Sequence, residues 1–336
     1  MMNGADLITL AHGNGGRFMR ELVRDVFARH FQSAGLDISA DAACLPPEAG
    51  TMVVTTDGFI VDPLEFPGGD IGSLAVHGSV NDLAVSGATP RWLTLGFLIE
   101  EGFAMDRLVR IAMSIGRAAL ACGVAIVAGD TKVVPRGQGG GLYITATGIG
   151  TRSGPPLPGM AGIVTGDRLL VNGPVGDHGT AVLLARAEFG LRGDLRSDSA
   201  SVLPFARAAI KIPGLRFMRD PTRGGIATVA NEISQETGLR VVLDETMLPL
   251  RDEVRGVCDM LGYDPMYLAC EGRVVAVVDP AHAETLLAAW RDLPGGENAA
   301  IVGEIESGRR CVVLRTELGG GRLLAELEDD PLPRIC

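Results

Sequence analysis

The most informative stretch of the chain is residues 52–88, which read MVVTTDGFIVDPLEFPGGDIGSLAVHGSVNDLAVSGA. Its first residues are rich in valine and threonine, which favours a β-strand that stops at Asp57. Residues 70–86 then place apolar side chains at helical spacing, which predicts a helix with Asn81 and Asp82 inside it. A strand, a glycine-rich loop and a helix therefore follow one another, with carboxylates at the strand end and within the helix.

The same alternation of strands and helices continues along the chain. In the first half, further strands are expected at 92–99, 124–127 and 142–149, and helices at 15–31 and 106–122. In the second half, strands are expected at 168–171, 216–218, 239–243, 273–278, 300–303 and 311–314, with helices following residues 179 and 225 and near 251–261 and 283–293. We therefore expect an α+β protein built from two α/β domains.

Prolines and glycines mark the expected domain boundaries. Residues 154–159, which read GPPLPG, suit neither a helix nor a central strand and are the expected linker. The N-terminal domain is then residues 1–155, the C-terminal domain is 160–327, and a tail covers 328–336. The tail carries prolines at 331 and 333, so we expect it to be extended and mobile, with no residue in the core.

Composition limits the kind of protein. The 336 residues are 46% hydrophobic and 21% charged, a balance typical of a folded globular chain. The formal net charge of −11 argues against binding to nucleic acid or to an anionic membrane surface. No apolar run approaches the ~20 residues that span a bilayer, and the first residues lack the basic character of a signal peptide. We therefore expect a cytoplasmic protein that binds neither nucleic acid nor membrane.

Four aspartates are candidates for a phosphate and metal site. Asp57, Asp82, Asp130 and Asp220 each lie within two residues of glycine, threonine or asparagine, and three of them follow apparent strands. Carboxylates on separate rigid elements suit Mg²⁺ that bridges a triphosphate, although any one of them could also be an ordinary turn residue. No Walker motif is present, so an ATP site must be of another type. The glycine-rich residues 12–16 could hold phosphate or simply begin a helix.

Three further residues could carry chemistry. Lys132 could neutralise phosphate charge or, once deprotonated, act as a base, but it could also be a solvated lysine after a turn. Glu271 could be a surface cap or a proton acceptor. Cys336 is the last residue of the sequence, where its thiol could serve as a swinging carrier or could be there by chance. The other five cysteines are expected to be buried and to have no chemical role.

The motifs around these residues resemble those of a known family. They are TTDGF at 55–59, FPGGDIG at 66–72, VNDLAVSGA at 80–88, GDTK at 129–132, GDHG at 176–179, DPTRGG at 220–225 and PRIC at 333–336. Together they closely resemble the HypE family of hydrogenase maturation proteins, over essentially the whole chain. That family belongs with the ATP-using synthetases of purine, thiamine and selenophosphate biosynthesis, and the PRIC ending separates it from these relatives.

The resemblance implies a fold and a reaction. It implies that two N-terminal domains pair their sheets into a barrel-like homodimer with ATP near the interface, and that the C-terminal domain is an α/β sandwich. A HypF-type carbamoyltransferase would load a carbamoyl group onto Cys336, and ATP would drive its dehydration to a thiocyanate. The cyano group would then pass to iron on a HypC and HypD scaffold for the [NiFe] hydrogenase centre.

The resemblance also implies roles for single residues. Cys336 would be the carrier, and Lys132 and Glu271 would be the bases that remove the amide protons. The residues implied in ATP binding are Asp57, Asn81, Asp82, Asp130, Thr131, Asp220 and Gly224, and the four aspartates among them would hold Mg²⁺. Two rival hypotheses remain: a selenophosphate or purine-type synthetase would not need Cys336, and a non-enzymatic thiol or iron carrier would not need ATP.

Overall fold

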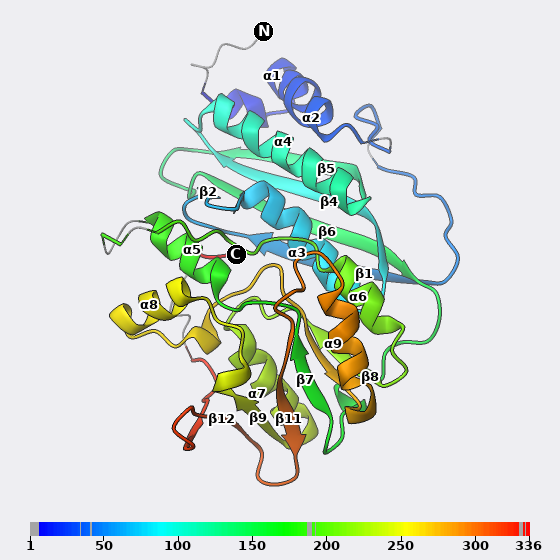
Figure 1. The fold of residues 1–336 in the computed structure, drawn as a ribbon. Helices are drawn as coiled ribbons and strands as arrows, with labels where there is room; N and C mark the ends of the chain where they lie inside the picture. Colours follow the sequence, from blue (N-terminus) through cyan, green and yellow to red (C-terminus); the bar gives the residue numbers. More distant parts are fainter. Residues whose placement is uncertain are drawn as a thin grey trace.

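The computed structural model describes residues 7–33, 35–40, 42–186, 190–191, 193–328, 332 and 334–336. They form two α/β halves, each built on its own sheet, and this confirms the α+β organisation expected from the sequence (Figure 1). The first half contains η1 (Leu10–Gly13), α1 (Arg17–Leu22), η2 (Val23–Ala28), α2 (Arg29–Phe31), β1 (Thr51–Phe59), β2 (Glu65–Phe66), β3 (Gly69–Asp70), α3 (Ile71–Val85), β4 (Thr89–Glu100), α4 (Met105–Cys122), β5 (Ala125–Val134) and β6 (Leu142–Arg152).

The second half follows residues 154–159, which form neither helix nor strand, as expected for a linker. It contains η3 (Met160–Gly162), β7 (Arg168–Val171), α5 (Asp177–Arg186), α6 (Leu203–Ile210), β8 (Leu215–Arg219), α7 (Gly225–Thr237), β9 (Arg240–Asp244), η4 (Glu245–Met247), α8 (Asp252–Leu261), η5 (Pro265–Tyr267), β10 (Val275–Val278), η6 (Pro280–His282), α9 (Ala283–Arg291), β11 (Ala300–Glu306), β12 (Cys311–Arg315) and β13 (Gly321–Leu323). Among the described residues, no helix is long and apolar enough to cross a membrane.

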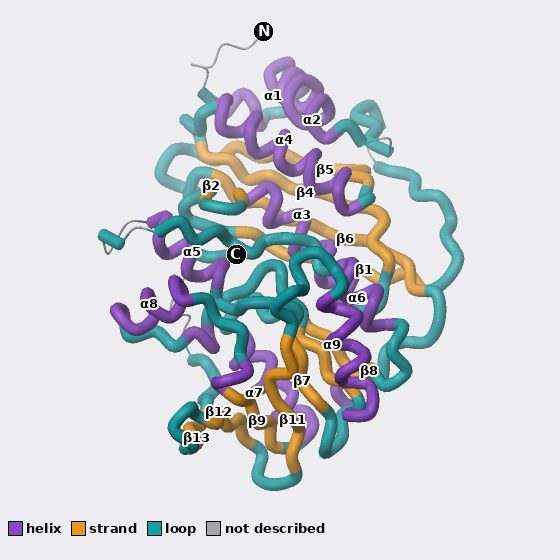
Figure 2. Tube along the Cα trace, in the orientation of Figure 1, coloured by secondary structure: helices purple, strands orange, loops and turns teal. Residues whose placement is uncertain are grey.

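The first sheet has the strand order β1-β6-β4-β5, and within the described part of the chain helices cover one of its faces. Helices α3 and α4 lie across it, and we call this covered side the inner face (Figure 2). On the opposite, outer face, Met52 is 48% exposed and Val54 is 63% exposed. Exposed apolar side chains on a regular sheet are unusual for a monomer and are typical of a surface that pairs with another chain.

Several strands run further than the sequence predicted, and two of them, β1 and β5, carry candidate site residues. β1 was expected to stop at Asp57 and β5 to end before Gly129, but β1 continues to Phe59 and β5 to Val134. The reason is pairing with long neighbouring strands, since Asp57 lies opposite Ala146 of β6 and Asp130 lies opposite Gly96 of β4. Ladder hydrogen bonds thus override the weak strand propensity of aspartate and glycine. Both aspartates belong to the sheet rather than to turns that follow it.

The helices mostly begin and end where the sequence predicted. Asp70 is the N-cap of α3, and its carboxylate accepts hydrogen bonds from the backbone N–H groups of Gly72 and Ser73. The helix expected at 15–31 is interrupted, because residues 23–28 have π-helical hydrogen bonding between α1 and α2.

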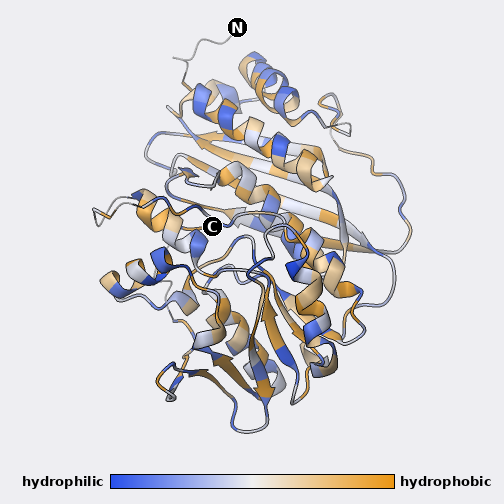
Figure 3. Ribbon diagram, viewed as in Figure 1, coloured by the Kyte–Doolittle hydropathy of each residue, from blue (hydrophilic) through white to orange (hydrophobic). Residues whose placement is uncertain are grey.

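The second sheet is buried on both faces. Its order is β13-β12-β9-β11-β7-β10-β8, with α7 packed on one face and α6 and α9 on the other. The four residues of β10 are all fully buried, which explains their uninterrupted apolar sequence. The strands of this sheet are correspondingly hydrophobic (Figure 3). The side chain of Trp290 is buried under it and donates a hydrogen bond to the carbonyl of Phe205.

The described tail residues lie between the two halves (Figure 1). Leu332 and Ile335 are buried within the core that both halves share, so the expectation that no tail residue belongs to the core was wrong. Ile335 forms a β-bridge with Val61, just beyond β1. The two prolines that the sequence argument used, at 331 and 333, lie outside the described residues. The mobility of the tail stays a prediction.

One close helix contact gives a test of the packing. A Cβ atom on Gly116 of α4 would lie 2.0 Å from the carbonyl oxygen of His30. We expect Gly116→Ala to lower the free energy of unfolding by about 1–3 kcal/mol through overpacking. The control is Gly256→Ala in α8, where a Cβ would have no neighbour within 4 Å. This substitution should raise the free energy of unfolding by about 0.5–1 kcal/mol, because alanine favours the helix more than glycine does. Urea unfolding of both variants measures the difference, and equal stability of the two would contradict this packing.

Candidate active site

Three of the four predicted aspartates meet in one small cavity between the halves. Asp57 comes from β1, Asp82 from α3, and Asp220 from the loop between β8 and α7. The cavity measures about 40 Å³, and its lining residues are Asp57, Gly58, Phe59, Gly78, Asp82, Asp220, Thr222, Arg223, Glu271 and Cys336. A cavity of this size admits a group of only a few heavy atoms, since about 10–15 Å³ of such volume holds one water molecule. The same three aspartates also line an open hollow of about 430 Å³ beside it.

The carboxylates in this cavity repel one another. Burial and the nearby Asp82 raise the pKa of Asp57 to about 6. Burial, with the charge of Asp82, raises the pKa of Asp220 to about 7. Asp82 accepts a hydrogen bond of 2.5 Å from the hydroxyl of Thr55. A cation placed among these groups would relieve the repulsion.

The donor set fits Mg²⁺ that is shared with phosphate. Hard carboxylate oxygens from three separate elements are ligands that this ion prefers. Among the described residues, no group of three or more acidic, histidine or cysteine side chains could hold a metal by itself. The remaining ligands would therefore have to come from phosphate oxygens or water, which is the usual arrangement for Mg²⁺.

Glu271 is a buried carboxyl group rather than a surface cap. It is 2% exposed, and its Oε1 atom has no hydrogen-bond partner among the described residues. Burial first, and then the charges of Asp220 and Asp198, raise its pKa well above the ordinary value. The sequence argument left a cap and a proton acceptor open; the structure excludes the cap and places the carboxyl in the same cavity as Cys336.

The backbone of Glu271 is held from two sides. Its N–H donates to a carboxylate oxygen of Asp198 at 3.1 Å, and its carbonyl accepts from the Asn81 amide at 3.1 Å. The same Asn81 amide donates to the carbonyl of Ala200 and accepts from the N–H of Val202. A nucleotide that accepted a hydrogen bond from the Asn81 amide would have to break one of the two bonds that this amide already donates.

Asp130 and Lys132 lie on the outer face of the first sheet. Asp130 pairs with Gly96 of β4, so these two residues share a face of the sheet. Asp57 pairs with Ala146 of β6, which in turn pairs with Leu95 of β4, so Asp57 shares a face with Leu95. Alternate residues of a strand face opposite sides, so Asp130 and Asp57 point to different faces. β5 and β1 are also at opposite edges, about 14 Å apart at ~4.8 Å per strand. One chain therefore does not bring all four aspartates together.

Lys132 is exposed and pairs with Asp130. Its Nζ lies 2.8 Å from a carboxylate oxygen of that residue. Both side chains line an outer-face hollow of about 350 Å³ that reaches Gly58 and Ile60, whereas Lys132 is absent from the lining of the Cys336 cavity. Of the two predicted bases, the chain by itself brings only Glu271 to the thiol.

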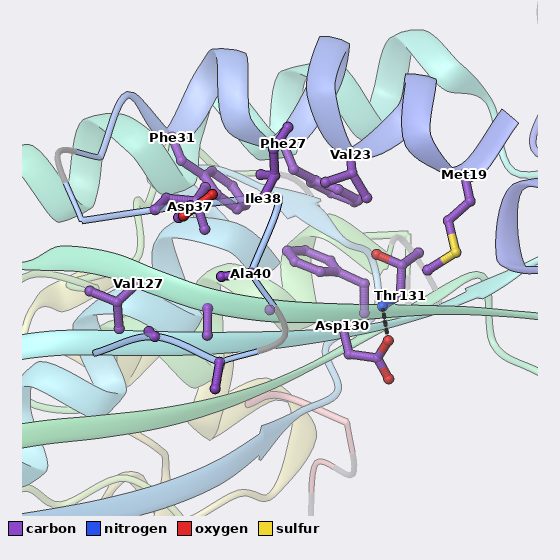
Figure 4. A pocket seen from close by; sticks show the side chains of 16 residues that line it. Met19, Val23, Phe27, Phe31, Asp37, Ile38, Ala40, Val127, Asp130 and Thr131 are labelled. Atoms are coloured by element: carbon purple, nitrogen blue, oxygen red, sulfur yellow. Dashed lines mark hydrogen bonds between the residues drawn. The ribbon is translucent and has the colours of Figure 1, made fainter. Parts of the chain in front are cut away.

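A larger apolar slot lies beside β5 (Figure 4). It measures about 360 Å³ and lies between helical residues 19–31, the loop at 36–43 and β5. The rings of Phe27, Phe31 and Phe97 line it, and the two sequence-predicted residues Asp130 and Thr131 are at its edge. A slot with aromatic walls and a polar end suits a flat heterocycle joined to a charged group.

Two of the remaining predicted positions have mainly conformational roles. Gly224 precedes α7 with a left-handed φ of 70°, where a side chain would approach the Thr228 hydroxyl. In the glycine-rich residues 12–16, Gly13 packs against β5, since a Cβ there would lie 2.6 Å from the N atom of Val133. The expected contacts of Gly224 with ATP and of residues 12–16 with phosphate stay predictions.

Sequence reasoning missed two residues of the site. Arg223 is a cation that lines the cavity of acidic groups, and it was visible as the one basic residue of DPTRGG. The buried ring of His178 touches the tail, and its Nε2 lies 2.5 Å from the carbonyl oxygen of Ile335. The GDHG motif pointed to this histidine but not to its partner, which is 157 residues away.

The cysteines also differ from expectation. Cys258 and Cys270 are buried as predicted, but Cys44 is exposed, and Cys122 and Cys311 are half-buried. Cys336 is the cysteine that lines the cavity with the carboxylates. Cys336 is half-buried like Cys122 and Cys311, so exposure alone does not distinguish it from these two, whereas its surroundings do.

Comparison with known proteins agrees with this geometry. Residues 39–152 match the model of the AIR synthase related protein N-terminal domain, and residues 164–315 match that of the C-terminal domain. The carbamoyl dehydratase HypE of Cupriavidus necator is 45% identical over 98% of this chain and 95% of its own length. A solved structure of HypE in complex with ATP is 44% identical, with a TM-score of 0.92, over 98% of this chain and 99% of that one. A chain from a HypE–HypF complex is 39% identical, with a TM-score of 0.80, over 91% and 99%.

The crowded carboxylates predict an unusual dependence of stability on pH. The pKa of Asp220 rises from 3.8 to about 7 on folding, so the folded protein binds more protons than the unfolded chain between these values. Stability therefore falls as pH rises through this window and stays low above it. We expect Asp220→Asn to be more stable than wild type by roughly 1–3 kcal/mol at pH 8, and no different below pH 4.

Urea unfolding in buffer with EDTA measures this difference without bound metal. The control is Asp259→Asn, because Asp259 is an exposed aspartate of α8. A variant at position 220 that is less stable than wild type at pH 8 would show that the carboxylate is not under repulsion.

Proposed function

This chain belongs to the HypE family of carbamoyl dehydratases, and from that premise we propose how its cavity performs the reaction on Cys336. The protein is an ATP-dependent dehydratase of hydrogenase maturation. It converts a carbamoyl group to the cyanide that becomes a ligand of the [NiFe] hydrogenase iron. The observation that supports Cys336 as the carrier is its position in one cavity with Glu271 and three aspartates.

The reaction must remove one oxygen and two protons from an amide. The substrate is a thiocarboxamide, in which the Cys336 sulfur bears C(=O)NH₂. ATP phosphorylates the amide oxygen with loss of one N–H proton, and the C–O bond then breaks as phosphate leaves with the second proton. The products are a thiocyanate on Cys336, ADP and phosphate. Phosphorylation is needed because an amide oxygen is otherwise a poor leaving group.

The cavity supplies a base and a place for charge. When deprotonated, Glu271 is a stronger base than an ordinary carboxylate, because burial raises its pKa and so favours the protonated carboxyl group that forms when it accepts a proton. Asp57, Asp82 and Asp220 would hold Mg²⁺, which offsets the charge on the transferred phosphoryl group. Arg223 adds a fixed positive charge on the same wall. The cavity of about 40 Å³ matches the few heavy atoms that loading adds to the sulfur.

The nucleotide is proposed to enter from the apolar slot. Its adenine ring would lie against the packed cluster of Phe27, Phe31 and Phe97, with its phosphates leaving past Asp130 and Thr131 at the edge of β5. Because β5 and β1 are opposite edges of one sheet, the phosphates cannot reach Asp57 of the same chain along this path.

A homodimer resolves this separation. We propose that two four-stranded sheets close into a barrel in which the β5 edge of one copy meets the β1 edge of the other. The exposed outer face with Met52 and Val54 would then be the buried interior. Asp130 and Lys132 of one copy would then lie beside the β1 edge of the other, and we propose that they reach the cavity with Cys336 around this seam, from the opposite face of the joined sheet. Lys132 thereby keeps its proposed role as the second base.

The partners follow from the chemistry. The related HypE was solved in complex with HypF, and we propose that a HypF-type carbamoyltransferase loads Cys336. A HypC and HypD scaffold is proposed to receive the cyano group, and the cytoplasm remains the expected compartment. The two rival hypotheses are not favoured. A selenophosphate or purine-type synthetase would have no use for Cys336 in this cavity, and a thiol carrier that does not use ATP would have no use for the three aspartates.

Mass spectrometry tests the carrier role. Incubation with carbamoyl phosphate, ATP and the transferase should add about 43 Da to the C-terminal peptide and then remove about 18 Da, from the masses of the covalent groups. Glu271→Gln should acquire the first mass but not undergo the second change, because loading needs only the thiol. Cys336→Ala should fold normally and acquire neither.

The matched control for this experiment is Cys44→Ala, which removes an exposed thiol remote from the cavity and should behave as wild type. Modification found on Cys44, Cys122 or Cys311 instead of Cys336 would disprove the carrier assignment.

Mixing two inactive variants tests the shared site. Lys132→Ala lacks a base and Cys336→Ala lacks the carrier, but one site of their heterodimer would contain both residues from different copies. After co-expression in equal amounts, we expect about a quarter of wild-type dehydration, because half of the dimers are mixed and each has one complete site. Zero activity in the mixture, with dimers confirmed by mass, would place Lys132 and Cys336 in the same copy.

A further inference from the structure

The tail backbone is bound on both of its edges. On one edge, the N–H of Ile60 donates to the carbonyl oxygen of Cys336 at 3.2 Å, and the N–H of Asp62 donates to that of Arg334 at 3.0 Å. Between them, the carbonyl of Ile335 points the opposite way, as alternate carbonyls of an extended chain do. It meets Nε2 of His178 at 2.5 Å. The residue directly before Cys336 is thus fixed from two directions.

His178 is arranged to donate this hydrogen bond. Its other ring nitrogen, Nδ1, lies 2.8 Å from the hydroxyl of Ser197, and that hydroxyl oxygen accepts from the N–H of Ser199. The Ser197 hydroxyl can therefore donate its proton to Nδ1. A neutral imidazole ring has one N–H, and this arrangement places it on Nε2, facing the Ile335 carbonyl. Phe66 packs edge-on against the ring at 5.3 Å. Burial lowers the pKa of His178, which keeps the ring neutral.

Arg186 ties the same segments together from the surface. Its Nε donates to the carbonyl of Asp62, and its Nη2 donates to that of Arg334, both at 2.8 Å. Arg186 is the last residue of α5, and His178 is in the first turn of that helix. One short helix therefore presents two donors to consecutive carbonyls of the tail.

We propose that His178 is a positioning residue for Cys336: its hydrogen bond to the Ile335 carbonyl, assisted by Arg186, holds the tail in the reacting position. Neither side chain is among the residues that line the cavity. They act only through the backbone next to the thiol. The proposal deepens the proposed function and rests on it, since Cys336 is taken as the loaded group.

The two steps of the reaction make opposite demands on this bond. A transferase must reach the Cys336 thiol, so loading requires the tail to leave the cavity. Dehydration requires the tail to return and stay. Loss of the His178 donor shifts the balance toward the released tail, which favours access to the thiol and disfavours the chemical step.

The variants His178→Leu and His178→Gln separate the donor from the packing. Leucine removes the donor but keeps an apolar side chain against Phe66, whereas the glutamine amide can donate in place of Nε2. We expect His178→Leu to label Cys336 with a maleimide roughly five- to tenfold faster than wild type, as loss of one buried hydrogen bond implies. Pre-loaded His178→Leu should dehydrate its carbamoyl group more slowly than wild type, because a smaller fraction of the tails is docked. His178→Gln should restore both rates toward wild type.

The exposed Cys44 is the internal reference for labelling, because its rate should be the same in every variant. Labelling does not depend on the carbamoyl reaction, so failure of the proposed function would leave this arm of the experiment intact. Equal labelling of Cys336 in wild type and His178→Leu would overturn the proposal. So would slower dehydration that His178→Gln does not restore, since that pattern indicates a loss of packing alone.

A second variant covers the case in which His178→Leu does not fold. Arg186 is at the surface, so Arg186→Ala should fold, and we expect it to raise Cys336 labelling and lower dehydration in the same directions. The control is Arg207→Ala, which removes an exposed arginine of α6 and should change neither rate. Unchanged rates in Arg186→Ala would contradict the positioning of the tail by α5.

Discussion

The side-chain amide of Asn81 is the contact on which the site depends. It extends from α3 in the first half and binds three backbone groups in the second, at Ala200, Val202 and Glu271. The carboxylates of Asp57 and Asp82 belong to the first half, and those of Asp220 and Glu271 to the second. They form one cavity only because the halves are joined here, and a buried amide with all of these bonds made is costly to displace.

Local patterns in the sequence predicted most of the elements but not their ends. The helix after Asp70 and the apolar strand at 275–278 follow from periodicity and from burial on both faces. The ends of β1 and β5 were wrong, because strand length depends on the neighbour that provides the hydrogen bonds. This error mattered, since strand register decides that Asp57 and Asp130 face opposite sides of the sheet.

The sequence motifs predicted which residue types make up the site, but they did not predict the contacts between residues that are far apart in the sequence. Motifs pointed to Asp57, Asp82 and Asp220, which the fold does bring together. Nothing near Glu271 in the sequence shows that its carboxyl is buried, because the polar and charged groups around it come from positions more than 45 residues away. His178 was visible as part of GDHG. Its partner is the backbone carbonyl of Ile335, which a residue of any type would provide, so the sequence could not identify it.

The docked tail has a kinetic consequence. The substrate is covalently attached to Cys336, and Ile60 and Asp62 bind the backbone around this residue. The effective molarity of the substrate at the carboxylates is therefore set by the geometry of the docked tail and not by the concentration of a free substrate. Dehydration per molecule should then be first order and unchanged by dilution for as long as the assembly persists. Collisions with the transferase and with the receiving scaffold do depend on concentration, so scarcity of the protein in a cell would slow loading and delivery and leave the dehydration step unchanged.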